Sequence, residues 1–408
     1  MPELNAGDTA WLLIATAMVM VMLPGLALFY GGLVRRKNVL SVIMHSFFGL
    51  ALVSVVWVVV GFSLAFGPDV NGAGLIGGLD FVGFANVGLE PNPAYAGTIP
   101  FVLFASFQLM FAAITPALIT GAFAERKRFG AFVLFILMWS ILVYSPIAHW
   151  VWAPGGWLRE LGALDFAGGT VVHISSGVSA LVAALLIGRR WSNGDRLVPH
   201  DVPMTVLGAG LLWFGWFGFN AGSALAANGL AANALLVTNT AAGAATLTWV
   251  LASYAHRRKV SVIGAAAGAV AGLVAITPAS GFVTAGGAVL IGLTAGGVCY
   301  SATLLRERLR IDDALDVFAV HGVGGMLGAV ATGVLAVAAI GGVSGAIEGN
   351  LGQVWIQLIA VAVVAAFSAG ATFVIVKFIE FVLGLRVERQ AEEVGLDLAV
   401  HGEVAYQL

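Results

Sequence analysis

Long apolar stretches recur along the whole sequence, and short segments containing Gly, Pro or charged residues separate them. A helix needs roughly 20 predominantly apolar residues to cross the hydrocarbon core of a bilayer. The stretches have helical length and do not alternate between apolar and polar positions, which argues against the strands of a membrane barrel. The pattern therefore predicts an all-α integral membrane protein with about eleven transmembrane helices, at 10–32, 40–66, 100–124, 130–150, 167–188, 202–226, 233–255, 260–278, 282–305, 314–340 and 354–384.

Composition supports the membrane interpretation. Apolar types make up 60% of the chain and charged types 10%, against about 25% charged residues in an ordinary soluble domain. The formal net charge is −2 and no long basic tract occurs, so nucleic acid is not an expected partner. The single cysteine, Cys299, excludes a disulfide within the chain. No basic region precedes Arg35, so we expect the first span to remain in the protein.

The basic residues predict the orientation of the helices. Eighteen of the 19 Lys and Arg residues close or follow odd-numbered spans, and only Arg159 falls on the opposite side. Because cytoplasmic loops collect Lys and Arg, we expect the N-terminus outside the cell membrane and the C-terminus inside. The segment 67–99 is expected to form an ordered outer cap. We divide the chain into a transmembrane domain, residues 1–385, and a polar, acidic tail, residues 386–408.

Two histidines mark a weak internal repeat. His173 lies in the fifth predicted span and is followed four residues later by Gly177, and His321 lies in the tenth span and is followed at the same distance by Gly325. Each histidine thus belongs to the fifth span of a five-span half. Because five is odd, the two halves enter the membrane from opposite sides. We therefore predict an inverted five-plus-five repeat with a final helix, and a site near the membrane midplane.

The chemistry available to two midplane histidines is limited. A single intramembrane histidine could be a packing residue bonded to a backbone carbonyl, but two at matching positions favour a functional role. No cage of carboxylates accompanies them, and an unpaired cation would lose much hydration energy at this depth. Two neutral imidazoles can guide a small polar solute or relay a proton. Neither a metal site, a cofactor nor an enzyme activity follows, because a third ligand or a nucleophile is missing.

Six motifs around these histidines resemble the ammonium transporter family (Amt/MEP, with the Rhesus proteins as relatives). The resemblance covers essentially the whole chain and is carried by residues 24–34, 111–119, 165–173, 213–223, 316–325 and 397–406. It implies that His173 and His321 line a pore. It also implies that this chain belongs to the ammonium branch, because the aromatic residues expected in its vestibule are present.

Further roles come only from this resemblance. Trp152 resembles the family's recruitment tryptophan, whose ring face attracts a cation, and Ser223 resembles the hydroxyl that accepts a hydrogen bond from ammonium. Phe111 and Phe219 resemble the stacked pair that closes the vestibule above the pore, with Phe111 also contacting the substrate. Without the resemblance, aromatic residues at helical spacing would be read as packing residues. The sequence departs from the family pattern at 152–157, which leaves the rim of the vestibule undefined.

Asp165 and Trp216 are expected to support the site. Asp165 lies where the fifth span begins, so its carboxylate is a natural N-cap for backbone amides. It also resembles the family aspartate that holds the outer site together, and Trp216 lies in the motif that ends at Ser223. The family further implies a homotrimer with one pore per subunit and, in many members, a PII-type signalling protein bound to the cytoplasmic face.

The resulting hypothesis is ammonium uptake. Ammonium, or its analogue methylammonium, would be recruited as a cation and deprotonated at the vestibule, and ammonia would pass the histidines, with or without a relayed proton. The alternatives are a passive channel for NH3 or CO2 and a sensor that signals through the tail. We also expect the acidic residues of the tail to oppose the basic residues of the inner loops, namely Arg126, Lys127, Arg128, Arg257 and Arg258.

Overall fold

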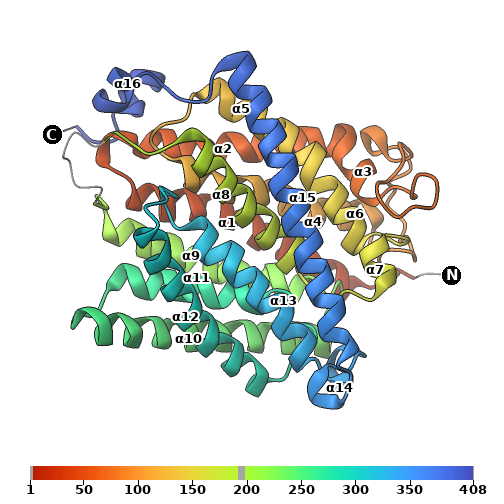
Figure 1. Ribbon diagram of the computed structural model, residues 1–408. Helices are drawn as coiled ribbons and strands as arrows, with labels where there is room; N and C mark the ends of the chain where they lie inside the picture. Colours follow the sequence, from red (N-terminus) through yellow and green to blue (C-terminus); the bar gives the residue numbers. More distant parts are fainter. Residues whose placement is uncertain (1–2, 192–197, 408) are drawn as a thin grey trace.

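The structure is a computed structural model that describes residues 3–191 and 198–407. In these ranges the chain is helical and contains no β-strand beyond isolated bridges. Ten helices of the described part are long and apolar enough to cross a membrane, and the shorter apolar helix α11 (Val262–Ile276) lies among them (Figure 1). The prediction of about eleven apolar membrane helices is therefore confirmed.

The first half of the chain contains five predicted spans, several of which are interrupted by π- or 3₁₀-helical pieces. Its elements are α1 (Ala6–Leu33), η1 (Arg36–Asn38), α2 (Val39–Val56), η2 (Trp57–Gly61), α3 (Phe62–Phe66), η3 (Val82–Phe84), α4 (Phe101–Ile119), η4 (Thr120–Phe123), α5 (Phe129–Trp139), η5 (Ser140–Tyr144), α6 (Ser145–Trp152), α7 (Trp157–Leu161), η6 (Gly169–Ile174) and α8 (Ser175–Ile187).

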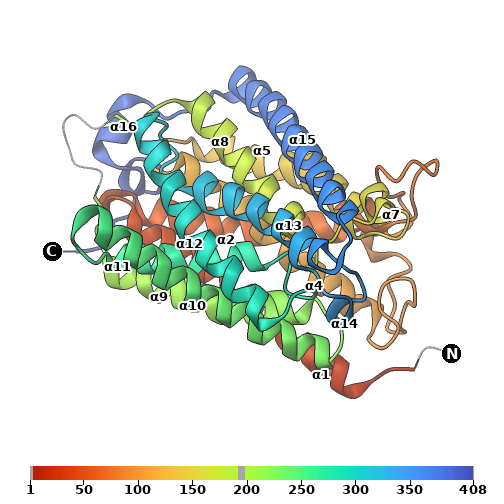
Figure 2. The same cartoon turned by 60° about the horizontal axis from the view of Figure 1, so that its bottom comes forward.

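The second half contributes the remaining spans and the tail. Besides α11, its elements are α9 (Val202–Gly222), α10 (Gly229–Arg257), α12 (Ala285–Arg308), η7 (Phe318–Gly322), α13 (Val323–Leu335), α14 (Ala338–Gly341), η8 (Ala346–Glu348), α15 (Gly352–Leu383), α16 (Arg389–Val394) and η9 (Asp397–His401). Helix α1 packs along α9, and α10 packs against both α11 and α12 (Figure 2).

Most predicted spans agree with these helices to within a few residues, and one differs more clearly. The eighth span, predicted at 260–278, corresponds to α11 to within two residues at each end, although this helix has only 15 residues. The tenth, predicted at 314–340, is a continuous helix only from Phe318 to Leu335. The left-handed backbone of Asp316, with a φ of +58°, precedes this helix, and the extended backbone of Ala336 ends it. Element boundaries of this kind are the least reliable part of a prediction from sequence.

Polar side chains cap several of the apolar helices at their first residues. Asp201 accepts a hydrogen bond from the backbone N–H of Met204 over 2.8 Å and so begins α9. Caps of this kind satisfy amides that have no partner inside the helix. The same arrangement begins α1, α10, α11 and α12, through Asn5, Asn228, Ser261 and Thr284.

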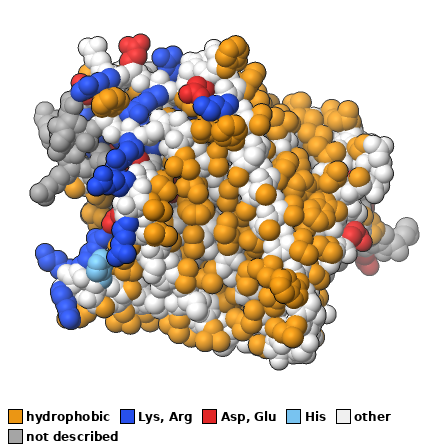
Figure 3. All heavy atoms as spheres, in the orientation of Figure 1, with side chains coloured by type: hydrophobic (Ala, Val, Ile, Leu, Met, Phe, Trp, Pro, Cys, Tyr) orange, Lys and Arg blue, Asp and Glu red, His pale blue; other side chains and the backbone are white. Residues whose placement is uncertain are grey.

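The molecule has two chemically different ends. We call the end that carries residues 384–407 the tail face, and the end that carries segment 67–99 and α7 the loop face. Between them a broad apolar surface covers the helices, and Lys and Arg side chains gather toward the tail face (Figure 3). This distribution agrees with the charge asymmetry in the sequence.

The tail folds back against its own chain. The carboxylate of Asp397 accepts hydrogen bonds from the backbone N–H groups of Leu40 (3.0 Å) and Ser41 (2.8 Å), at the start of α2. The backbone N–H of Leu396 donates to the side chain of Asn38 over 2.8 Å. Burial raises the pKa of Asp397, and the hydrogen bonds from α2 oppose that shift.

The predicted charge pairing of the tail is wrong. Among the described residues, no ion pair joins a tail carboxylate to Arg126, Lys127, Arg128, Arg257 or Arg258. The buried Glu392 instead pairs with Arg386 of the tail itself, over 2.8 Å. The inner loop meets the tail through backbone groups, for example where Val387 N–H donates to the carbonyl of Arg126. Hydrogen bonds to the backbone leave no signal in a pattern of charged residues.

Candidate transport site

His173 and His321 lie side by side in the interior. The Nδ1 atoms of the two imidazoles are 3.2 Å apart and the ring centroids 5.3 Å apart. Their exposed fractions are 1% and 4%. Each histidine belongs to a short π-helical segment, η6 or η7, although the segments are 148 residues apart in the chain.

A pair of glycines explains this close approach. A Cβ on Gly177 would lie 2.1 Å from the backbone nitrogen of Gly322, and a Cβ on Gly325 would lie 2.9 Å from the Cβ of His173. Only glycine therefore allows α8 and the His321 segment to cross at this distance. The two glycines that follow the histidines in the sequence are thus the ones that let the two halves meet.

The contact restricts the protonation of the pair. An Nδ1–Nδ1 hydrogen bond needs one donor and one acceptor, so the two rings cannot both be imidazolium. If both rings are neutral, the donating ring keeps an acceptor at its Nε2, and the accepting ring keeps a donor there. The Nε2 of His173 has no hydrogen-bond partner among the described residues. The pair can therefore offer both a donor and an acceptor to a small solute.

A narrow apolar passage surrounds the pair. It encloses a cavity of about 10 Å³, close to the volume that a single water-sized sphere occupies. Apart from the two histidines, its walls consist of apolar and aromatic side chains: Met22, Leu26, Phe29, Ile114, Leu118, Val172, Leu212, Trp216, Phe219 and Val270. Trp216 stacks on the ring of His173 and is held by a 2.8 Å hydrogen bond from its Nε1 to Thr277, which agrees with a structural role.

Two phenylalanines close the passage on the side of the loop face. The ring centroids of Phe111 and Phe219 are 4.2 Å apart, and both side chains are buried. Trp152 lies beyond them, with its ring edge-to-face with Phe111 at 5.8 Å. Aromatic rings thus follow one another from Trp152 to His173 in the order that the resemblance implied.

A small vestibule opens beyond the phenylalanines, at the loop face. Its volume is about 160 Å³, and it is lined by Phe66, Tyr95, Phe104, Gln108, Phe111, Trp152, Arg159, Phe166, Ser223 and Leu225. The hydroxyl of Ser223 donates to the carbonyl of Phe219 over 2.8 Å. Its hydrogen is therefore committed, and the lone pairs of its oxygen are available to accept from a solute.

Three residues with polar groups in this vestibule, Tyr95, Gln108 and Arg159, were not among the predicted site residues. The Oε1 of Gln108 is buried and has no hydrogen-bond partner among the described residues. Arg159 was used in the sequence analysis only for orientation. Gln108 lies three residues before Phe111 on α4, so helical spacing could have placed both on one face.

Asp165 organises the start of the His173 segment. Its carboxylate accepts hydrogen bonds from the backbone N–H groups of Gly168 (2.8 Å), Gly169 (2.6 Å) and Thr170 (2.7 Å), so it caps this segment as predicted. Its backbone carbonyl accepts a 3.0 Å hydrogen bond from the indole of Trp152. One residue therefore positions both the vestibule tryptophan and the helix that carries His173.

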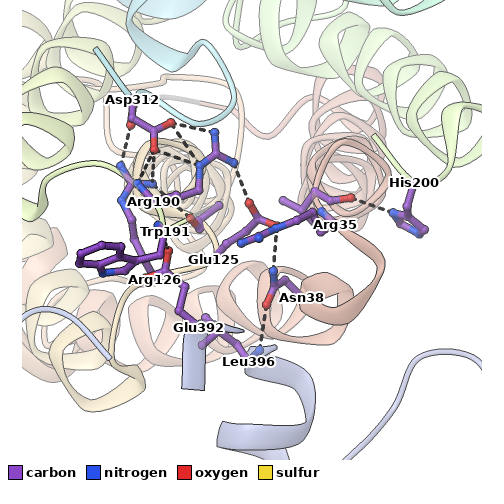
Figure 4. A network of polar contacts seen from close by, with 12 residues as sticks. Arg35, Asn38, Glu125, Arg126, Arg190, Trp191, His200, Asp312, Glu392 and Leu396 are labelled. Atoms are coloured by element: carbon purple, nitrogen blue, oxygen red, sulfur yellow. Dashed lines mark hydrogen bonds and ion pairs between the residues drawn. The ribbon is translucent and has the colours of Figure 1, made fainter. Parts of the chain in front are cut away.

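A larger cavity reaches the histidines from the tail face. It has a volume of about 890 Å³, and His321 forms part of its lining. Its wall includes an ion-pair network in which Arg190 bonds to Glu125 and Asp312, each over 2.7 Å (Figure 4). Arg35 bonds to the same Glu125 over 2.9 Å. The network ties together the ends of several helices around the mouth of the cavity.

The charges of this network stabilise each other. Burial raises the pKa of Asp312, but hydrogen bonds from Arg190 and the charges of Arg190 and Arg126 outweigh it and lower that pKa to about 2. The pKa of Glu125 is also lowered, because Arg190 and Arg35 outweigh the effect of its burial. Both carboxylates are therefore ionised at neutral pH.

A narrow apolar passage lies between the loop-face vestibule and the tail-face cavity, in a bundle of membrane-length helices. This arrangement defines a channel or transporter for a small solute. The chain belongs to the ammonium transporter family, whose model matches residues 10–406. The family resemblance expected from the sequence is therefore confirmed, and the protein is a transporter-family membrane protein.

Named relatives cover the full length of the chain. It is 49% identical over 407 residues to the ammonium transporter of Bacillus subtilis, with 99% of both chains covered. It is 47% identical to ammonium transporter Amt1 of Archaeoglobus fulgidus, with 99% of this chain and 100% of the relative covered.

Solved structures agree. Saccharomyces cerevisiae Mep2 superposes with a TM-score of 0.89 at 39% identity, covering 95% of this chain and 88% of that one. A structure described as a sensor Amt protein gives a TM-score of 0.89 at 33% identity, with 97% and 98% covered.

Proposed function

We propose that this protein takes up ammonium across the cell membrane, with the loop face outside and the tail face in the cytoplasm. The observation that carries this proposal is the His173–His321 pair, 3.2 Å between Nδ1 atoms, inside an apolar passage of about 10 Å³. Such a passage suits a small solute that can both donate and accept hydrogen bonds. The gathering of Lys and Arg toward the tail face supports the orientation.

Recruitment takes place in the loop-face vestibule. The face of Trp152 attracts the ammonium cation, and the Ser223 hydroxyl oxygen accepts a hydrogen bond from it. The buried Gln108 Oε1, which lacks a partner among the described residues, offers a second acceptor. These groups replace part of the hydration shell that a cation loses on entering.

Ammonia, rather than ammonium, then enters the passage. A cation would find no carboxylate in the walls that surround the histidine pair, so ammonium transfers its proton to water in the vestibule. That proton then either stays outside or crosses by a separate relay. Phe111 and Phe219 must rotate apart to let the solute pass, because their rings fill the entrance. Ammonia then donates to one imidazole Nε2, accepts from the other, and is protonated again in the tail-face cavity.

Current measurement in proteoliposomes tests this proposal. We expect inward current with ammonium, a smaller current with methylammonium and none with potassium, if a proton accompanies each ammonia. Flux of ammonia without current would favour a passive gas channel, and transport of CO2 but not ammonium would contradict the proposal. A current carried equally by potassium would contradict the proposal that the solute crosses the passage as neutral ammonia.

A second candidate function is sensing. A structural neighbour that shares 33% identity is described as a sensor Amt protein, and the tail of this chain contacts the start of α2 directly. A homotrimer and a PII-type partner at the tail face would fit either function. Deletion of the tail that abolishes nitrogen signalling while flux continues would support the sensor.

A further inference from the structure

Arg159 is the only charged residue among the described residues that line the loop-face vestibule. Its guanidinium donates through Nη1 to the backbone carbonyl of Trp152, the residue whose ring is proposed to attract ammonium. The vestibule that is proposed to bind a cation thus contains a permanent positive charge. The recruitment proposal does not account for this charge.

The backbone that carries Arg159 is firmly packed, although the Arg159 side chain itself is exposed. Helix α7 begins where the N–H of Trp157 donates to the carbonyl of Gly74 over 3.2 Å, and Leu158 is fully buried. It ends at Gly162, which has a φ of +93° and whose carbonyl accepts a 2.9 Å hydrogen bond from Gln353. A Cβ on Gly156 would lie 2.0 Å from the carbonyl oxygen of His149. The segment that departs from the family pattern is therefore a firmly packed support for Arg159.

No carboxylate belongs to the described residues that line the vestibule. The other polar groups of the described lining are neutral: the Gln108 amide, the Ser223 hydroxyl and the Tyr95 phenol. The Arg159 side chain is exposed, so water screens part of its charge. The apolar walls of the vestibule screen charges less than water does, so the remaining field still acts on an ion inside. Arg159 must therefore disfavour any cation that occupies the space beside Trp152.

We propose that Arg159 is an affinity-determining residue that weakens the binding of ammonium in the vestibule. This inference rests on the proposed recruitment of ammonium as a cation. The repulsion raises the ammonium concentration at which the vestibule fills. It also keeps the bound cation from becoming so stable that its loss of a proton slows. Because the effect is electrostatic, it applies to methylammonium and potassium as well.

A charge series at position 159 tests the proposal. We would measure KM and maximal rate for methylammonium in proteoliposomes with Arg159→Lys, Arg159→Gln and Arg159→Glu. The KM should stay near that of the unchanged protein with Lys, fall about two- to fivefold with Gln, and fall by a similar factor again with Glu. The differences should shrink at 0.5 M salt, where the screening length is only about 4 Å. The maximal rate should not rise as the KM falls.

Glu160→Gln is the matched control, because Glu160 is exposed on the same short helix and does not line the vestibule. It changes the charge by one unit and should shift the KM less than Arg159→Gln does. If Arg159 only supports the Trp152 carbonyl, all three substitutions at position 159 should impair transport irrespective of charge. That result, or an equal KM throughout the series, would overturn the inference.

The Trp152→Leu variant separates this inference from the proposed function. If Trp152→Leu raises the KM while the Arg159 series is flat, ammonium is recruited as a cation and Arg159 has no part in its affinity. If neither Trp152→Leu nor the Arg159 series changes the KM, the proposal that ammonium is recruited as a cation is itself wrong.

Discussion

His173 and His321 contact each other through their Nδ1 atoms, so each side chain has only its Nε2 atom left for a solute. Replacing either by alanine removes one hydrogen-bonding group and widens the narrowest part of the passage. We expect His173→Ala and His321→Ala to lower the ammonium rate or weaken the exclusion of potassium without unfolding the protein. The double variant should admit larger or charged solutes. Unchanged rate and unchanged potassium exclusion in both single variants would contradict a pore role.

Trp152 is the second residue whose role can be isolated. Trp152→Leu keeps an apolar side chain and removes the ring face, so the apparent affinity for ammonium should fall by a factor of roughly 5–30, the equivalent of about 1–2 kcal/mol. The indole also donates to Asp165, and Trp152→Phe distinguishes the two effects because phenylalanine keeps a ring face but lacks the N–H. Wild-type affinity in Trp152→Leu would show that the charged form does not bind at this position.

Elements rather than single residues create the histidine pair. Helix α8 crosses η7 at Gly177, where a Cβ would lie 2.1 Å from the backbone of Gly322. We expect Gly177→Ala to force the two segments apart, to separate the imidazoles and to abolish transport with a loss of thermal stability. Gly370→Ala on α15 is the control, because a Cβ there meets nothing within 4 Å. Normal transport by Gly177→Ala would mean that the crossing tolerates a wider spacing than the structure implies.

Comparison with these elements also shows which parts of the fold and of the site could be predicted from the sequence. The apolar runs located the membrane helices, since length and composition suffice for that purpose. Matching positions in two halves identified His173 and His321, but the family resemblance was needed for Trp152, Phe111 and Ser223. Aromatic and hydroxyl side chains are common in packed helices, so their spacing alone carries no function. The π-helical form of η6 and η7 was not predicted, because such segments are rare, single-turn departures from an α-helix.

Gln108 and Arg159 illustrate a different limit. Both line the loop-face vestibule, yet one is a polar residue within an apolar helix and the other lies in a segment that departs from the family pattern. The interest of Gln108 lies in an oxygen that lacks a hydrogen-bond partner among the described residues, and that of Arg159 in a positive charge without a carboxylate in the vestibule lining. Those properties belong to the folded molecule and cannot be obtained from residue types in order.

At the scale of the whole molecule, hydrogen bonds link the tail to the mouth of the tail-face cavity. Asn38 donates to Glu125 over 2.8 Å and accepts from the backbone of Leu396, so one side chain joins the ion-pair network to the tail (Figure 4). The expected pairing of acidic tail residues with basic loops was wrong, but the tail still contacts the same region. It does so through helix ends and backbone amides, which bind a carboxylate such as Asp397 as readily as a basic side chain does.

Removing residues 386–408 tests the tail as a unit. A loose terminus would tolerate deletion, whereas this tail satisfies the N–H groups at the start of α2 and the side chain of Asn38. We expect the shortened protein to insert and assemble but to lose most of its ammonium transport, because the network around Glu125 loses one of its supports. Asp397→Ala should reproduce part of the loss, since it removes the carboxylate that caps α2, while Glu403→Gln, at an exposed position of the same tail, should have little effect. Transport would be assayed in proteoliposomes after the oligomer is checked by gel filtration. Full activity of the shortened protein would show that the tail is dispensable, and lost activity with intact assembly would assign control of the pore to the tail face.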